Sequence, residues 1–419
     1  MSDPGATTVS HDPASRVAAS RYAVDGVIPA RVVVPEHEEG VAAALDDAIR
    51  SGAAAIAVGA GTQLDLGNPP ERYDVALDLR RLSALVAHDP PDMTVTVQPA
   101  VALAALQEAL AHHNQFLPLD PPLPSTATVG GVVATNAFGP WRHAYGTARD
   151  WVIGMRMVLG TGTVTKSGGR VVKNVTGYDL HKLHIGALGT LGVITEVTFK
   201  LAPLPRASRS VAVRVDTPHD GVALILGAQT RGMAVTAAEL LSPSAARGVF
   251  GDKRWTVLFR LAGGEAAVER TLRDIPDLAP AAGSIEDVPE DTWQRWAREM
   301  HAAPLAMTLS VRPSRLGPAL AALEDTDLCE AALSATVGAG YVRVAAQGGE
   351  GVFGPLYDAA ARVAAERSGR VVVVRAPVAS KGAIDVFGAP RADLAIMRRI
   401  KQEYDPHRVL APGRFYGHI

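Results

Sequence analysis

Two glycine-rich segments contain the residue types that could bind a phosphorylated ligand. Residues 59–63 read Gly-Ala-Gly-Thr-Gln after an apolar run, and residues 126–131 read Thr-Ala-Thr-Val-Gly-Gly. Glycine lets the main chain approach a ligand closely, so that free N–H groups and hydroxyls can donate to phosphate oxygens. An ordinary turn or a loop between strands would explain either segment alone. The two segments together favour a clamp for a diphosphate.

Several other chemistries lack the residues that they need. Leu64 stands where a dinucleotide-binding fingerprint would place its third glycine, and no Gly-Lys-Ser/Thr follows for a phosphate loop. No Gly-x-Ser-x-Gly elbow offers a hydrolase nucleophile. The twelve histidines, His181 and His184 among them, show no metal-ligand spacing, and we interpret 112–113 as a solvated helix end. We therefore predict no metal site.

The composition indicates a globular protein of two domains. The chain has 419 residues, of which 47% are hydrophobic and 20% are charged. Its net charge of −2 gives no electrostatic reason to expect nucleic acid or an anionic membrane surface as a partner. The single cysteine, Cys329, excludes an internal disulfide and a multi-cysteine zinc or iron–sulfur site within this chain. It also fits a reducing cytoplasm.

No segment of the sequence has the pattern of a targeting signal or a membrane span. Residues 1–21 have no apolar core, and we predict that they form a disordered leader. No stretch offers the roughly 20 strongly apolar residues that a transmembrane helix needs.

Strands and helices alternate around the glycine-rich segments. A predicted helix at 35–52 leads through a strand at 54–58 into the first segment, as in an α/β unit. Pro203 and Pro205 break the chain, so we place a domain boundary near 205. Before it, we predict strands at 73–79, 93–97, 151–159, 163–166 and 193–201, and helices at 103–113 and 178–188. After it, we predict strands at 208–215, 255–261, 305–311, 340–346 and 370–375, and helices at 221–231, 291–301, 353–368 and 391–404.

Four motifs resemble those of the FAD-binding oxidoreductases of the vanillyl-alcohol-oxidase type, which carry a PCMH-type FAD domain. They are 117–122 (Leu-Pro-Leu-Asp-Pro-Pro), 127–131, 173–179 (Lys-Asn-Val-Thr-Gly-Tyr-Asp) and 187–194. The chain is most similar to the FAD-binding subunit of bacterial glycolate oxidase. The resemblance implies an α+β fold, with a two-part FAD-binding domain at 22–205 and a mixed α/β, ferredoxin-like cap domain at 206–390. Residues 391–419 would return to the FAD domain.

The resemblance also implies where FAD is bound. The first glycine segment would wrap the pyrophosphate and the second would complete the clamp, with Gly146 and Thr147 near the flavin and the backbone of Ile194 near the adenine. Some relatives tether the flavin through a histidine where this chain has Thr62, so we expect FAD without a covalent link. The expected cofactor contacts are Val58, Gly59, Ala60, Gly61, Thr62, Gln63, Thr126, Thr128, Val129, Gly130, Gly131, Asn136, Gly146, Thr147, Gly192 and Ile194.

Two departures from the family pattern affect the expected mechanism. Ala411 stands before the closing Pro-Gly-Arg414, where the family usually has Asn. Residues 336–343 (Thr-Val-Gly-Ala-Gly-Tyr-Val-Arg) match a His-Val-Gly-Asp-Gly-Asn-x-His string whose histidines help to bind a metal and the substrate in related D-2-hydroxy-acid dehydrogenases. Neither Thr336 nor Arg343 is a serviceable ligand for a divalent metal. Arg343 and Arg414 are candidate catalytic residues that could meet a carboxylate or the flavin edge, with a structural role as the alternative.

The resemblance implies an FAD subunit of a glycolate (D-2-hydroxy-acid) oxidase complex, in which a hydride moves from a small hydroxy acid to the flavin. Electrons would leave through an iron–sulfur subunit, because this chain has no cysteines for a cluster. A catalytic FAD subunit is a second expected partner. We expect the protein in the cytoplasm, or at the inner membrane through its partners. Two alternatives stay open: a self-sufficient, metal-free flavin dehydrogenase acting on another alcohol or hydroxy acid, and a structural subunit with a redox-silent flavin.

Overall fold

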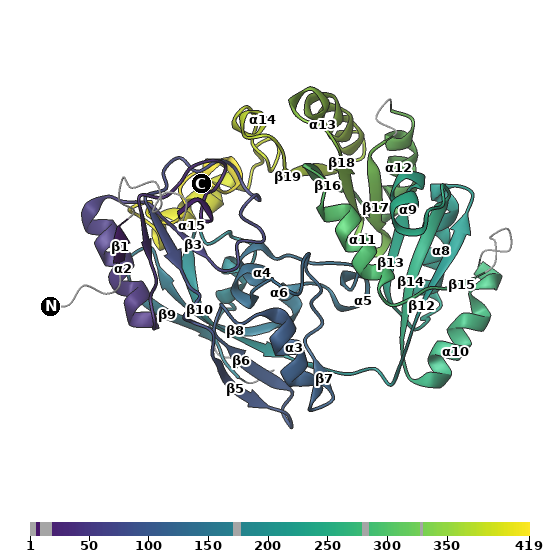
Figure 1. Cartoon of the computed structure of the whole chain (residues 1–419), viewed down its shortest axis with the longest axis horizontal. Coiled ribbons are helices and arrows are strands. Elements are labelled where there is room, and N and C mark those ends of the chain that lie inside the picture. Colours follow the sequence, from purple (N-terminus) through teal and green to yellow (C-terminus); the bar gives the residue numbers. More distant parts are fainter. Residues whose placement is uncertain (1–5, 9–18, 171–176, 279–284, 327–329) are drawn as a thin grey trace. The chain divides into compact units, whose positions relative to one another are not determined.

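The computed structural model describes residues 6–8, 19–170, 177–278, 285–326 and 330–419. The chain divides into two compact units (Figure 1). The first comprises Met1–Phe138, Thr147–Leu204 and Ala389–Ile419, and the second comprises Gly139–Gly146 and Pro205–Gly388. The leader predicted at 1–21 and the motif at 173–179 lie largely outside the described residues. No helix among the residues described has the length and apolar character that crossing a bilayer requires.

A small, mostly parallel sheet begins the first unit. Its strand order is β1 (Ala6–Thr8), β2 (Arg31–Val33), β4 (Val75–Asp78) and β3 (Ala55–Val58). β2 and β3 both run parallel to β4, so their carboxyl ends lie at one edge, where residues 59–63 follow β3. Helix α2 (Glu38–Ser51) packs Val41 and Leu45 into the core of this sheet, and left-handed Gly52 (φ 67°) ends it.

The second sheet of the first unit has five antiparallel strands. Their order is β5 (Leu85–Asp89), β6 (Thr94–Val97), β10 (Gly192–Lys200), β8 (Val152–Leu159) and β9 (Val164–Gly168). Helices α3 (Leu103–Ala111) and α4 (Val129–Thr135) bury their apolar side chains in the core of this sheet. The short helices α6 (Ala148–Trp151) and α7 (His181–His184) and the strand pair β7 (Gln115–Phe116) and β11 (Ala202–Pro203) complete this part.

A buried ion pair orders the end of the chain, and its lysine also bonds to Thr190 in an earlier part of the first unit. Helix α15 (Leu394–Tyr404) carries Lys401, whose Nζ lies 2.7 Å from Asp405 Oδ2 and also donates to the carbonyl oxygens of Thr190 and Leu410. Asp405 is fully buried and accepts from the backbone N–H groups of Val409 and Leu410. These bonds satisfy both charges, which a buried pair needs to be stable.

The second unit is built on one antiparallel sheet of eight strands. Their order is β15 (Glu286–Asp287), β12 (Ala207–Val215), β14 (Trp255–Gly263), β13 (Val235–Leu241), β17 (Ala332–Thr336), β18 (Tyr341–Ala346), β16 (Leu305–Ser310) and β19 (Arg370–Arg375). One face packs on α8 (Pro218–Thr230), α10 (Glu265–Asp274), α12 (Leu316–Glu324) and α13 (Glu350–Ala365). The other face packs on α9 (Pro243–Phe250) and α11 (Thr292–His301). The short helices α5 (Arg142–Tyr145) and α14 (Val378–Gly382) also belong to this unit.

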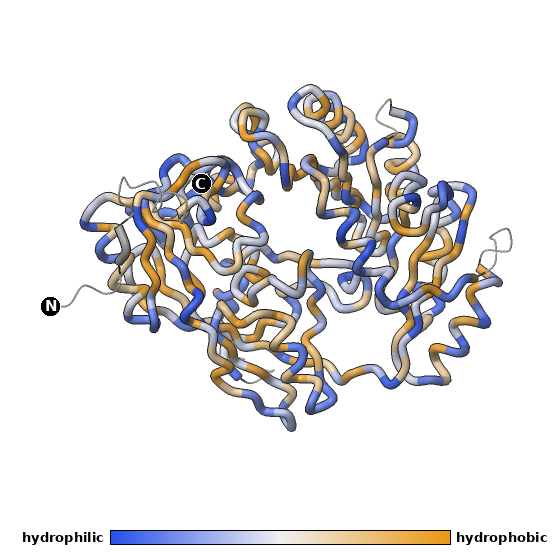
Figure 2. The backbone as a smooth tube through the Cα atoms, viewed as in Figure 1, coloured by the Kyte–Doolittle hydropathy of each residue, from blue (hydrophilic) through white to orange (hydrophobic). Residues whose placement is uncertain are grey.

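The alternation of burial along the strands separates these two faces. In β18, Val342 and Val344 enter the larger core, while Ala345 enters the smaller core under α9 and α11. Figure 2 shows mostly hydrophobic strands beside a more hydrophilic α10, whose buried residues are Val268 and Thr271.

The structure corrects one expected helix. Only His181–His184 (α7) is helical within the predicted helix at 178–188. Ile185 has an extended conformation (ψ 116°) that ends the helix, and the left-handed Gly186, Leu188 and Gly189 (φ 79°, 54° and 73°) prevent it from resuming. The second glycine segment also differs from a simple loop, because its Gly130 and Gly131 lie in the first turn of α4.

Candidate functional site

Residues from three parts of the predicted site line one cavity in the first unit. The cavity has a volume of about 70 Å³. It lies where the end of β3, the start of α4 and the start of β10 meet. Its lining contains the predicted residues Gly59, Thr128, Gly130, Gly131, Gly192 and Ile194, together with Ala57, Leu79, Pro99, Ala134, Leu188, Gly189 and Val193.

The glycines of this cavity lie where side chains would collide. A Cβ atom at Gly130 would lie 2.5 Å from the Cβ of Pro99, and the Gly130 N–H already donates to the Pro99 carbonyl oxygen at 2.7 Å. A Cβ at Gly59 would overlap the hydroxyl oxygen of Thr128. At Gly131 the nearest atom would be the same hydroxyl oxygen, at 3.2 Å, so a Cβ there would require only a small shift of one side-chain group and would meet no backbone atom within 4 Å outside its own helix.

Asn136 contributes an unsatisfied acceptor to this region. It ends α4 in a left-handed conformation (φ 49°), and its Oδ1 is buried without a hydrogen-bond partner among the described residues. A buried polar atom without a partner is unfavourable by about 1–3 kcal/mol. A bound ligand could satisfy it.

The remaining predicted contacts are dispersed. Gly59, Ala60 and Gly61 are exposed after β3, whereas the side chain of Val129 lies in the apolar core. Thr147 begins α6, where its N–H donates to Asp150 Oδ2 at 2.8 Å in a capping box. Gly146 belongs to the second unit. Val58 is buried at the end of β3, and Thr126 is exposed.

The buried ring of His184 packs next to Gly192, which lines the cavity. The sequence did not indicate this role. The ring of His184 is 3% exposed, packs against Tyr404 with centroids 5.5 Å apart, and would lie 3.0 Å from a Cβ at Gly192. Its Nδ1 has no partner among the residues described. Burial lowers the pKa of His184 to about 4, so the ring is neutral at physiological pH.

Acid should therefore destabilise the protein through His184. The unfolded chain binds this proton with a pKa of 6.5 and the folded chain with a pKa of about 4, so stability is full above pH 6.5 and is lost as the pH falls toward 4. We expect about 2 kcal/mol of this loss between neutral pH and about pH 5. Urea unfolding at both pH values checks this. In a His184→Leu variant, the free energy of unfolding should fall by about 2 kcal/mol less between the two pH values. The same fall as in the parent protein would contradict the assignment of this pH dependence to His184.

Arg414 fixes the chain that follows the first glycine segment. Its guanidinium donates to the carbonyl oxygens of Leu64, Leu66 and Asn68, and it pairs with Asp25 at 3.2 Å. The side chain is buried. These contacts favour a structural role for Arg414 in holding residues 64–68.

Arg343 belongs to a buried polar cluster in the second unit. Glu239 is fully buried and accepts from Ser334 Oγ and Thr336 Oγ1, both at 2.5 Å, and from Arg343 Nη1 at 3.3 Å. The guanidinium lies over the rings of Trp296 and Tyr341, 5.2 Å from each centroid.

The motif at 336–343 contains both Thr336 and Arg343 but gives no sign of their shared partner, Glu239. The one available signal for it was an acid within the apolar run at 237–241. Because buried acids are rare unless they are paired, that run indicated a buried partner but not its identity.

A second guanidinium, that of Arg375, makes the surroundings of Arg343 electropositive. Arg375 Nη1 donates to the carbonyl oxygens of His301 and Ala303 at 2.8 Å. Burial, followed by the charges of Arg343 and Arg375, lowers the pKa of His301 to about 3, so this ring is neutral. Two guanidinium groups and one carboxylate leave a net positive charge that suits an anion. Within the described ranges, no group of three His, Cys, Asp or Glu side chains could hold a metal ion.

Two family models match the chain. Residues 29–168 match the family described as FAD binding domain, and residues 389–415 match FAD linked oxidases, C-terminal domain.

Similar curated proteins include subunits of glycolate oxidase. "Glycolate oxidase subunit GlcE" of Escherichia coli is 36% identical over 177 residues, which cover 42% of this chain and 50% of the relative. "Glycolate oxidase subunit GlcD" of Bacillus subtilis is 32% identical over 184 residues, which cover 44% of this chain and 39% of the relative. "D-lactate dehydrogenase [cytochrome], mitochondrial" of Arabidopsis thaliana is 31% identical over 258 residues (60% and 45%). The chain thus spans half or less of the length of these relatives.

Solved structures share the fold over most of the chain. A p-cresol methylhydroxylase superposes with a TM-score of 0.75 at 16% identity, covering 97% of this chain and 93% of its own. An alkyldihydroxyacetonephosphate synthase superposes with a TM-score of 0.70 at 17% identity, and the match covers 92% of this chain and 77% of the synthase chain. The predicted α+β fold is confirmed.

Proposed function

We propose that this chain is an FAD-linked oxidoreductase and that its first unit holds FAD without a covalent link, since residues 29–168 match the FAD binding domain model and residues 389–415 match the C-terminal domain of FAD linked oxidases. The observation that carries this proposal is the cavity shared by Gly59, Thr128, Gly131 and Ile194. The five glycines of the lining and the unsatisfied Asn136 acceptor nearby fit a closely approaching dinucleotide. When bound, FAD supplies the ring that accepts a hydride from the substrate.

Each part of the cavity has a proposed task. Residues 59–63 wrap the pyrophosphate with backbone N–H groups, and Thr128 adds a hydroxyl donor. The backbone of Ile194 lies beside the adenine. Arg414 keeps residues 64–68 in place, so that the preceding glycine segment has a fixed end. The task of the protein is to orient the flavin and to exclude water from it.

We further propose that Arg343 recognises the carboxylate of a small D-2-hydroxy acid. Three observations support this role: its pairing with Glu239, the neutral His301 and the second guanidinium of Arg375. Glu239 acts as a positioning residue, because its carboxylate fixes the orientation of the Arg343 guanidinium. Thr336 and Arg343 replace the metal ligands of related dehydrogenases, so the proposed site works without a metal.

The proposed assembly is a glycolate oxidase complex, cytoplasmic or bound to the inner membrane through partners. Similarity to two proteins named as glycolate oxidase subunits supports it. An iron–sulfur subunit would take the electrons, and a second FAD subunit would be catalytic. A self-sufficient dehydrogenase is the second candidate, favoured by the similarity to a D-lactate dehydrogenase.

Anaerobic reduction distinguishes these two candidates. The flavin-loaded chain is mixed with glycolate and with D-lactate, first alone and then with the co-expressed partner subunits, while flavin absorbance is followed. Bleaching that needs the partners supports the complex, whereas bleaching of the chain alone supports the self-sufficient enzyme. Bleaching by dithionite but by no hydroxy acid in either mixture would contradict both and would leave a redox-silent structural subunit.

A further inference from the structure

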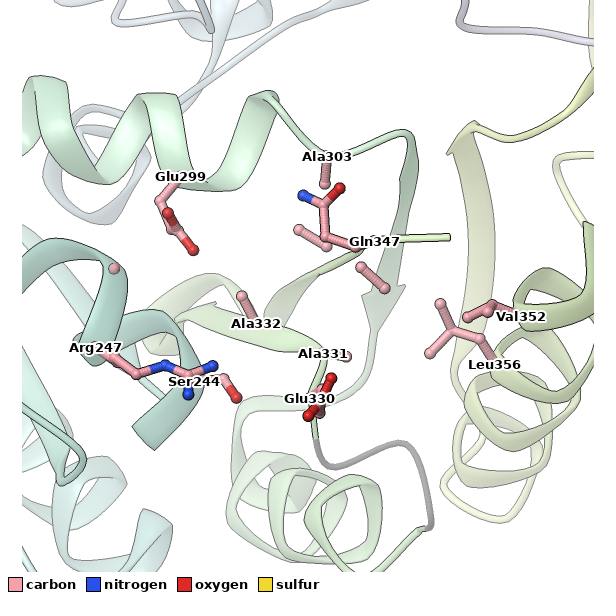
Figure 3. A pocket seen from close by; sticks show the side chains of 13 residues that line it. Ser244, Arg247, Glu299, Ala303, Glu330, Ala331, Ala332, Gln347, Val352 and Leu356 are labelled. Atoms are coloured by element: carbon pink, nitrogen blue, oxygen red, sulfur yellow. The ribbon is translucent and has the colours of Figure 1, made fainter. Parts of the chain in front are cut away.

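A second cavity lies in the second unit, and no predicted cofactor or substrate residue lines it. Its volume is about 520 Å³, within the roughly 300–1,000 Å³ typical of small-molecule sites. Helix α9 forms one wall with Arg247, α11 forms another with Glu299, and α13 forms the opposite wall with Val352 and Leu356 (Figure 3). Glu330 also lines the cavity and lies two residues before β17.

The three charged side chains of this cavity have no ion-pair or hydrogen-bond partner among the described residues. Within the described part of the chain, the side chains of Arg247, Glu299 and Glu330 make no ion pair or hydrogen bond, with one another or with other side chains. Glu299 enters the cavity beside α9 because residue 248 is glycine. A Cβ there would lie 2.5 Å from both Glu299 carboxylate oxygens. Charges of opposite sign therefore line one cavity without neutralising each other, which leaves them available to a ligand that carries both complementary charges.

The far side of the cavity is apolar. Leu356 is buried, Val352 is 37% exposed, and Ala332 and Ala345 form part of the lining between the two sides. A simple carboxylate would be repelled by Glu299 and Glu330, and a simple amine would be repelled by Arg247. A simple carboxylate would leave both glutamates without a cation, and a simple amine would leave Arg247 without an anion.

We propose that this cavity binds a zwitterionic amino acid with an aliphatic side chain. Arg247 takes the carboxylate, Glu299 and Glu330 take the ammonium group, and Val352 and Leu356 contact the side chain. The site is independent of the proposed flavin chemistry. Helix α11 connects it to the Arg343 cluster, because Trp296 packs on Arg343 from the same helix that carries Glu299.

Isothermal titration calorimetry of the flavin-loaded chain tests the site with three small molecules that share the same branched carbon skeleton and differ in their charged groups. L-Leucine should bind at least about tenfold more tightly than 4-methylpentanoate, which lacks the ammonium group, and than 3-methylbutylamine, which lacks the carboxylate. Equal binding of leucine and either single-charge probe, or no heat with leucine at millimolar concentrations, would overturn the proposal.

Variants assign the binding to this cavity. Arg247→Ala and Glu330→Gln should each weaken leucine binding at least about tenfold. Both side chains are exposed, so neither change should alter the thermal unfolding midpoint by more than a few degrees. Arg298→Ala and Glu265→Gln, which change exposed helical residues outside the cavity, are the matched controls. Leucine binding that survives both cavity variants would place it elsewhere and refute the proposal.

Discussion

A Gly131→Val variant is expected to fold normally and to lose most of its FAD. The new side chain would meet only the Thr128 hydroxyl oxygen, 3.2 Å from its Cβ, before projecting into the cavity. Valine is also a better helix former than glycine in the first turn of α4. The valine side chain would occupy space that FAD needs, so we expect the free energy of FAD binding to weaken by about 1–3 kcal/mol. This corresponds to roughly a 5- to 150-fold loss of affinity.

Flavin content per protein and the Kd for added FAD measure this effect. Gly351→Val is the matched control, because Gly351 lies in the first turn of α13 and a Cβ added to it would have no atom within 4 Å. Gly130→Val would be less informative, since its Cβ would strike Pro99 and disturb the fold itself. A Gly131→Val protein with normal flavin content and affinity would refute the clamp.

Glu239→Ala is expected to lower the free energy of unfolding by about 3–5 kcal/mol. The change leaves the Arg343 guanidinium buried without its counter-ion, and it removes the acceptor of the Ser334 and Thr336 hydroxyls. Urea unfolding of the apo and flavin-loaded proteins measures the loss. Glu265→Ala, at an exposed position on α10, should cost less than about 1 kcal/mol.

The double variant Glu239→Leu/Arg343→Met separates stability from substrate recognition. Replacing both charges with apolar side chains should recover about 2 kcal/mol or more of the loss, because no unpaired charge remains. If Arg343 recognises the substrate carboxylate, flavin reduction by the substrate should still be slowed about 10- to 150-fold, the equivalent of one charge-assisted hydrogen bond. A double variant that is reduced at the parental rate would restrict Arg343 to a structural role.

The sequence was most informative where structure is encoded locally. Helix α2 and strand β3 lie close together in the chain, and their pattern predicted both elements, whereas the clamp at residues 59–63 stays a prediction. The resemblance to FAD-binding oxidoreductases, inferred from short motifs, is confirmed by the family matches at 29–168 and 389–415.

Contacts between distant parts of the chain were not predictable. Glu239 and Arg343 are 104 positions apart, and the Arg414 contact with Leu64 spans 350. The strands that join such residues have no local signal for their partners, since pairing depends on the completed sheet. For the same reason, the sequence did not predict that Gly139–Gly146 belongs to the second unit while both flanking segments belong to the first.

The visible absorption spectrum of the purified chain, before and after acid precipitation, tests the central claim most directly. We predict a flavin spectrum, with the yellow chromophore released into the supernatant and identified there as FAD by chromatography. A chain that remains colourless after incubation with FAD would contradict the proposed cofactor site. Flavin that stays with the precipitated protein would contradict the non-covalent link inferred from Thr62.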